Sequence, residues 1–155
     1  MLICCPAWPK IRTGPAGRVR AEELSRVLRD ADVVQGLDAI LVGPGRALKE
    51  TAQPLARELN LPIQEVDTGN MRGVANHILK DYKGDIVLVV TSPSVLPELI
   101  PRFQGSKNVP ALANAEYDNL YIVSIPWYGK VKTLRLHYGV RAMPLMPSAS
   151  DASKG

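Results

Sequence analysis

The sequence is poor in cysteine, in aromatic side chains and in long apolar runs. Its two cysteines, Cys4 and Cys5, are adjacent, and adjacent residues of an extended strand point to opposite faces. A framework of structural disulfides is therefore excluded. We expect no metal site, because no second cysteine or histidine pair stands at ligand spacing. We interpret the pair as two small apolar residues that end a buried strand, with a soft-metal or redox role as the alternative.

The longest uncharged apolar run, around residues 86–90, is far shorter than the roughly 20 residues that cross a membrane as a helix. We therefore expect no membrane partner. The N-terminus has neither a basic leader nor an apolar segment ahead of a cleavage site, which predicts the absence of a signal peptide. A cytoplasmic location is the expectation that follows, although an exported chain restarted with a methionine would look the same.

The net charge of +4 raises the question of nucleic acid. The densest basic group lies at residues 10–20, and the helix predicted after it mixes arginines with acidic residues, as a solvated helix face does. Modules that bind nucleic acid interleave basic and aromatic side chains. In this chain only 5% of all residues are aromatic. We therefore expect no nucleic-acid partner. We also expect no cofactor.

Short apolar runs alternate with helical periodicities along the 155 residues. They predict strands at residues 2–5, 38–42, 62–66 and 85–91 and a C-terminal antiparallel hairpin of residues 120–125 and 131–138. Helices are predicted at residues 18–31, 48–59 and 71–82 and from Ser92 onward. This order predicts an α/β fold with a mostly parallel sheet and helices on both faces. We expect one domain at residues 1–139 and a disordered Pro- and Ser-rich tail at residues 140–155.

Two details of these helices make specific predictions. Pro54 should kink its helix or remove one backbone hydrogen bond. The next helix has the clearest apolar stripe, which predicts that His77, off the stripe, lies at the surface. The stripe predicted to enter the core consists of Met71, Val74, Ala75, Ile78, Leu79 and Tyr82.

In parallel sheets with helices on both faces, ligands bind outside the carboxyl ends of the strands. The loops at residues 6–10, 43–47 and 92–94 occupy that position in the predicted fold. Several segments in and around these loops resemble the histidine phosphatase superfamily, which has the phosphoglycerate-mutase-like fold. They are Pro15-Ala16-Gly17-Arg18, Thr51-Ala52-Gln53-Pro54-Leu55-Ala56, Ile86-Val87-Leu88-Val89-Val90, Pro97 and Glu116-Tyr117-Asp118-Asn119-Leu120.

The resemblance implies an Arg-His pair after the first strand, an arginine in the loop after the second strand and a histidine after the central strand. One histidine attacks phosphorus, while the other groups neutralise the phosphoryl oxygens. In this sequence the pair falls at Cys4-Cys5, or one residue later at Cys5-Pro6. The second arginine falls on or beside Ala47, with Arg46 next to it, and the later histidine falls on Ser92.

The family's reaction is therefore not expected, since its nucleophile, its second histidine and at least one arginine are replaced. Neither histidine of the chain, His77 or His137, lies in one of the three loops. Cysteine-based hydrolysis of phosphate esters is also not expected, because the sixth residues after Cys4 and Cys5 are lysine and isoleucine instead of arginine.

These replacements leave a vestigial phosphate pocket that is more apolar than the family's and suits a small neutral or aromatic ligand, or a partner's side chain. We expect a pseudophosphatase that serves as a binding or assembly subunit, with a protein partner, a second copy or a small molecule. The alternatives are an enzyme of changed chemistry, with Cys5, Ser92 or Arg46 as working groups, and a residual phosphatase. The predicted pocket residues are Cys4, Cys5, Pro6, Trp8, Arg46, Ala47, Ser92 and Ser94.

Trp127 and Tyr128, at the tip of the predicted hairpin, form a second candidate surface. Large aromatic side chains at an exposed turn are favoured in protein interfaces. The alternative is that both side chains pack over the edge of the sheet.

Overall fold

A computed structural model describes residues 2–6, 15–30, 36–105, 109 and 119–138. Trp8, the loop at residues 106–108 and 110–118, and the predicted tail lie outside these ranges, as do the side chains of Cys4, Cys5 and Pro6. No helix in the described ranges has the length and apolar character needed to cross a bilayer.

The elements follow the predicted order. Four strands alternate with four helices, and two more strands follow: β1 (Leu2–Pro6), α1 (Pro15–Asp30), β2 (Leu37–Val42), α2 (Arg46–Leu59), β3 (Ile63–Glu65), α3 (Met71–Asp81), β4 (Ile86–Thr91), α4 (Leu96–Arg102), β5 (Asn119–Ser124) and β6 (Lys132–His137).

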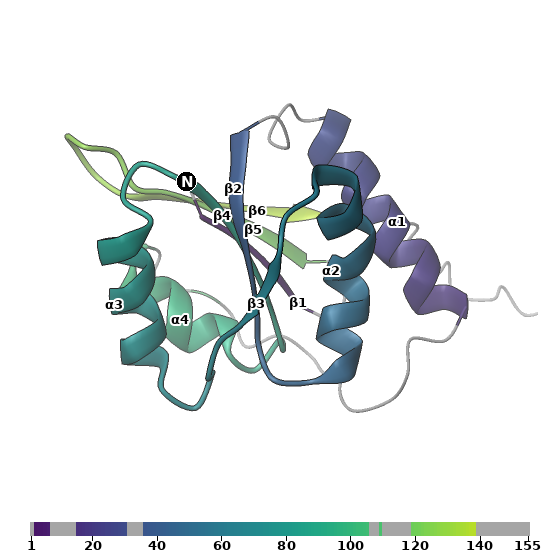
Figure 1. Cartoon of the computed structure of the whole chain (residues 1–155). Helices are drawn as coiled ribbons and strands as arrows, with labels where there is room; N and C mark the ends of the chain where they lie inside the picture. Colours follow the sequence, from purple (N-terminus) through teal and green to yellow (C-terminus); the bar gives the residue numbers. More distant parts are fainter. Residues whose placement is uncertain (1, 7–14, 31–35, 106–108, 110–118, 139–155) are drawn as a thin grey trace, which may run out of the picture.

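The strands form one six-stranded sheet in the order β3-β2-β4-β1-β5-β6 (Figure 1). Strands β1 to β4 run parallel to one another, and β5 lies antiparallel to both β1 and β6. The predicted mostly parallel sheet with an antiparallel C-terminal hairpin is thereby confirmed. The pairing of β5 with β1 joins the hairpin to the parallel part in a single layer.

Helices cover both faces of the sheet, with α1 and α2 on one side and α3 and α4 on the other (Figure 1). The alternation of β4 explains this arrangement, because successive strand residues point to opposite faces. Leu88 and Val90 pack with the first helix pair, and Val87 and Val89 pack with the second. A strand buried on both faces is typical of the centre of a parallel sheet.

Four local predictions can be compared with the structure. Helix α4 begins at Leu96 instead of at Ser92, because residues 93–95 form a turn in which the Val95 N–H donates to the Ser92 carbonyl at 3.0 Å. Leu79 is exposed, so it does not enter the core with the rest of the predicted stripe, whose last residue, Tyr82, is partly buried against the core. His77 lies at the surface as predicted, hydrogen-bonded to Asp81, and α2 continues through Pro54.

The buried central strands predict a steep difference between two leucine truncations. Leu41 of β2 is fully buried, whereas Leu134 of β6 is 54% exposed. Leu41→Ala should lower the free energy of unfolding by about 2–5 kcal/mol, because it removes buried methyl groups and leaves a cavity. Leu134→Ala should change that free energy by less than about 0.5 kcal/mol. Urea unfolding followed by circular dichroism measures both, and equal losses would contradict the two-layer core.

Candidate functional site

The carboxyl ends of β1, β2 and β4 meet at one edge of the sheet, which we call the carboxyl edge. Thr91, the last residue of β4, is in register with Pro6 of β1, and Val90 is in register with Val42 of β2. Neighbouring strands lie roughly 4.8 Å apart. The three predicted loops therefore begin side by side, as the sequence analysis expected.

The loop between β2 and α2 is held tightly against the central strand. The Gly43 N–H donates to the Val90 carbonyl at 2.9 Å, and a Cβ at Gly43 would lie only 3.0 Å from the methyl carbon of Thr68. Gly45 has a φ of 137°, which a residue with a Cβ adopts only under strain. These two glycines let the chain turn from the sheet into α2 within three residues.

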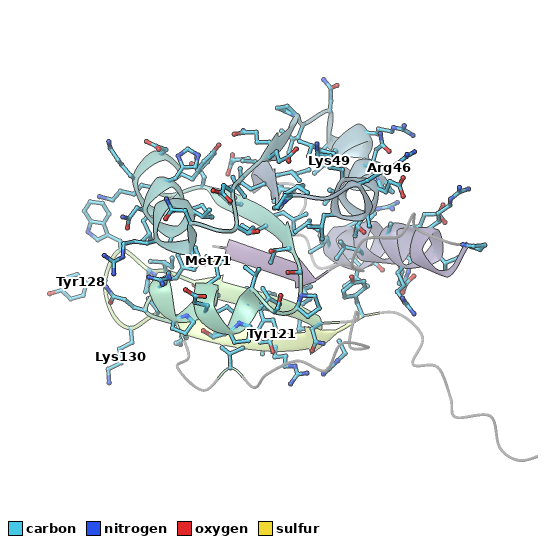
Figure 2. All side chains as sticks on the ribbon, turned by 90° about the horizontal axis from the view of Figure 1, so that it is seen from below. Arg46, Lys49, Met71, Tyr121, Tyr128 and Lys130 are labelled. Carbon is cyan, nitrogen blue, oxygen red and sulfur yellow. The ribbon has the colours of Figure 1, made fainter. Side chains whose placement is uncertain are left out.

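Arg46, a predicted pocket residue, points away from this edge. Its side chain is 70% exposed, and its Nε donates to Glu50 Oε1 at 2.9 Å, one helical turn along α2. It lines a cavity of about 330 Å³ between α1 and α2 together with Arg18, Glu22 and Arg57. In Figure 2 it lies on α2 beside Lys49, away from Tyr121 of the sheet. The guanidinium is thus engaged on the helix surface.

Ala47, where the resemblance places the second arginine, is 5% exposed. Its side chain is a single methyl group, and its carbonyl accepts a hydrogen bond from the Thr51 hydroxyl at 2.9 Å. A buried methyl group offers no charge and no hydrogen bond to an anion. This position therefore contributes packing and no phosphate contact.

Ser92 and Ser94 do come together in the loop after β4. Their Oγ atoms lie 3.0 Å apart, with either one as the donor. No imidazole or carboxylate among the described side chains is hydrogen-bonded to either hydroxyl. A serine nucleophile needs an adjacent base, so the described partners hold this pair in place without activating it.

Thr91 is a buried polar residue that the sequence analysis did not single out. It is fully buried, and its Oγ1 has no hydrogen-bond partner among the described groups. Burying an unpaired hydroxyl costs about 1–3 kcal/mol. Thr91 directly precedes Ser92, so the carboxyl edge holds a buried hydroxyl with no hydrogen-bond partner among the described groups.

Strands β5 and β6 hold a cluster of polar side chains that was not predicted from the sequence. Arg135 Nε donates to Asn119 Oδ1 at 2.6 Å, and its guanidinium carbon lies 5.8 Å from the ring centroid of Tyr121. His137 is in register with Asn119. The alternation of the hairpin could have indicated this group, because residues 119, 121, 135 and 137 share one face.

His137 was expected to lie outside the three loops, and the structure shows where it lies relative to them. Because β6 runs in the same direction as β1, His137 lies at the carboxyl edge, although outside the three loops. Strand β5 separates β6 from β1, so the backbone of His137 is roughly 10 Å from that of β1.

The cysteines can be placed only by their backbone. Cys4 is in register with Val89 and Tyr121, and Cys5 is in register with Val90, so both belong to a strand in the middle of the sheet. Their side chains, that of Pro6 and the whole of Trp8 lie outside the described part of the molecule. Within that part, no group of three histidine, cysteine or acidic side chains could hold a metal ion.

Trp127 and Tyr128 occupy the opposite edge of the sheet. They are 88% and 93% exposed, so they do not pack over the sheet edge. Figure 2 shows Tyr128 and Lys130 pointing outward from the hairpin tip. Next to Trp127 lies a cavity of about 780 Å³, which we call the hairpin pocket. The exposed aromatic side chains at the hairpin tip were a candidate surface from the sequence, whereas this pocket was not predicted.

The contrast between Thr91 and Thr51 generates a test. Thr91→Val replaces an unpaired buried hydroxyl with a methyl group and should raise the free energy of unfolding by about 1 kcal/mol. The matched variant Thr51→Val removes a hydroxyl that donates to Ala47 and should lower that free energy by about 0.5–1.5 kcal/mol. Chemical unfolding measures both. Destabilisation by Thr91→Val equal to that by Thr51→Val would mean that the Thr91 hydroxyl is satisfied.

No family model and no curated protein matches the sequence, but solved structures match the fold. A phosphoglycerate mutase from Plasmodium falciparum shares 13% identity, with a TM-score of 0.60 and coverage of 94% of this chain and 96% of that one. The product of an open reading frame of Mycobacterium tuberculosis shares 12% identity, with a TM-score of 0.61 and coverage of 86% and 94%.

A mycobacterial glucosyl-3-phosphoglycerate phosphatase shares 12% identity, with a TM-score of 0.57 and coverage of 88% of this chain and 96% of that one. These matches extend over almost the whole length of the other chains, so the likeness concerns the entire domain and not one βαβ unit. The described strands and helices of this chain therefore have a phosphoglycerate mutase-like fold.

Proposed function

We propose that this chain is a catalytically degenerate histidine-phosphatase-like protein, a pseudophosphatase that acts as a binding or assembly subunit. The observation that carries the proposal is the set of side chains at the carboxyl edge. Where the family resemblance implies a phosphate-binding arginine and a catalytic histidine, the chain has Ala47 and Ser92. These are small groups without positive charge.

The neighbouring arginine does not compensate for this loss. Phosphoryl transfer is accelerated mainly by positioned charges that stabilise the transferring group. Arg46 is largely exposed and paired with Glu50, so its charge is partly neutralised on the outer side of α2. To reach the carboxyl edge it would have to give up this ion pair.

The two histidines do not supply the missing nucleophile. His77 lies on the exposed side of α3, where its Nδ1 is 2.7 Å from Asp81 Oδ2. His137 is at the right edge of the sheet but two strands away from β1. A nucleophile must come within about 3–3.5 Å of phosphorus, and the backbone of His137 is separated from β1 by the whole of β5, which disfavours attack in a pocket centred on β1 and β4.

A binding role is favoured because the scaffold is kept while the charges are replaced. The carboxyl edge still has a tightly turned glycine loop, a pair of serine hydroxyls and the buried hydroxyl of Thr91. Neutral hydrogen-bonding groups at a sheet edge suit a neutral ligand, or a polar side chain of a partner, better than a phosphate dianion.

A second candidate function, an enzyme of changed chemistry, draws support from Thr91. A ligand that reached the unpaired hydroxyl would satisfy it, and Thr91 follows Val90, whose register partner is Cys5. Thiol reactivity distinguishes the two functions, since a working cysteine needs a depressed pKa. We expect iodoacetamide to label Cys4 and Cys5 no faster in the folded protein than in a denatured control. Faster labelling of the folded protein would favour the enzyme.

The pseudophosphatase proposal predicts an absence of phosphatase turnover. The full chain, incubated with p-nitrophenyl phosphate and separately with a phosphohistidine peptide, should release phosphate at the rate of the buffer blank. Loss of a nucleophile together with its phosphate clamp removes the mechanism, and does not merely slow it. Phosphate release is measured over hours at high protein concentration.

The matched variants are Ser92→Ala, at the carboxyl edge, and Ser124→Ala, at the exposed end of β5. Turnover above the blank that disappears in Ser92→Ala and persists in Ser124→Ala would overturn the proposal. Turnover that persists in both variants and also in Cys5→Ala and Arg46→Ala would identify a contaminating phosphatase.

A further inference from the structure

The hairpin pocket lies far from the carboxyl edge. It forms where the end of α3 and the start of β4 meet the end of β5 and the hairpin tip (Figure 1). Its buried floor consists of Ile78 and Val87, whose side chains belong to the core layer under α3 and α4. Its walls add Leu79, Tyr82, Ile125, Pro126 and Trp127. A volume of about 780 Å³ lies within the range of small-molecule sites, roughly 300–1,000 Å³.

The pocket also explains two exposed apolar side chains. Leu79 belongs to the apolar stripe of α3 but is exposed, because the pocket lies where a core side chain would otherwise cover it. Trp127 lines the same space and exposes most of its indole. An apolar group that fills this pocket would remove its own apolar surface and that of the lining side chains from water, which favours binding.

One cationic group stands at the mouth of this pocket. Lys83 Nζ lies 4.7 Å from the ring centroid of Trp127, a cation–π distance. The indole ring contacts one side of the Lys83 ammonium group. Because an ammonium group has three N–H donors, it can also pair with an acidic group of a ligand. Asp85 also lines the pocket, but it has an interaction of its own in the protein.

We propose that the hairpin pocket binds a small molecule with a flat apolar body and one acidic group. The apolar body would lie on Ile78 and Val87 and contact the face of the Trp127 indole, where aromatic rings gain from offset or edge contact. The acidic group would pair with Lys83 at the mouth. This site is independent of the carboxyl edge, so it goes beyond the proposed function and does not rest on it.

The probe for this test is 8-anilinonaphthalene-1-sulfonate, which is flat, apolar and singly anionic. The background variant is Trp8→Phe, because the chain has two tryptophans and the change leaves Trp127 as the only donor of excitation energy. Titration of the folded protein should give saturable binding of one probe per chain, with energy transfer from Trp127 to the probe. N-phenyl-1-naphthylamine, which has the same rings without the sulfonate, should bind about tenfold more weakly.

Four exposed positions supply matched variants, so loss of folding is not expected to confuse the result. Lys83→Met should weaken probe binding about tenfold, which corresponds to the loss of one charged contact, and should abolish the preference over the uncharged analogue. Trp127→Ala should weaken binding by a similar factor. Lys130→Met and Tyr128→Ala change the same hairpin tip outside the lining of the pocket and should leave binding unchanged.

Three outcomes of the binding titrations would overturn the proposal. They are binding of many probe molecules per chain, equal effects of Lys83→Met and Lys130→Met, and stronger binding of the uncharged analogue. Self-association of the protein that Trp127→Ala abolishes would assign the surface to a second copy, and would also overturn it. Phosphatase assays play no part in these readouts, so the proposal can fail without affecting the proposed function.

Discussion

The burial of β4 on both faces is the constraint on which the rest of the structure depends. Its five residues from Val87 to Thr91 are all buried, and its two edges pair with β1 and β2. A strand of this kind satisfies its backbone only through neighbouring strands on both sides, and its side chains only through a helical layer on each face. The two helix pairs, and the adjacency of the three loops at the carboxyl edge, follow from that requirement.

The local pattern was enough to predict most of this fold. The apolar run of β4, the stripe of α3 and the alternation of the hairpin each report burial that the chain itself encodes at period 2 or 3.6. The pattern does not contain the order of strands across the sheet. The insertion of β5 beside β1 depends on contacts between residues more than a hundred positions apart, such as Cys4 and Tyr121.

The incorrect prediction for Leu79 and the failure to predict the hairpin pocket also arise from contacts between segments that are distant in the sequence. Leu79 fits the stripe of α3 as well as Ile78 does, yet only Ile78 is buried, because the sheet and the hairpin leave a hollow beside the last turns of the helix. Periodicity describes which side of a helix faces inward, but not how far the neighbouring surface extends. The hairpin pocket was invisible for this reason, although its aromatic residue Trp127 was already a candidate.

At the carboxyl edge the sequence predicted which loops meet but not where their side chains point. Arg46 belongs to the correct loop, and its guanidinium nevertheless pairs with Glu50, four residues further along α2. A local ion pair at this spacing contributes only about 0.3–0.5 kcal/mol at a surface. A contribution of this size biases the rotamers of a flexible side chain, and the one-dimensional pattern does not show which rotamer is favoured.

The separation between core and loops explains how a fold can persist while its chemistry changes. Leu88, Val90 and the helices over them need apolar volume at set positions, a demand that many sequences meet; the 12–13% identities to the solved structures agree with this. Ser92 and Ala47 lie beyond the strand ends, where backbone geometry and not side-chain charge maintains the turn. A change of side chain there need not weaken the sheet. Fold and activity are therefore under separate physical constraints, because the core requires apolar volume and an active site requires particular side chains at particular positions.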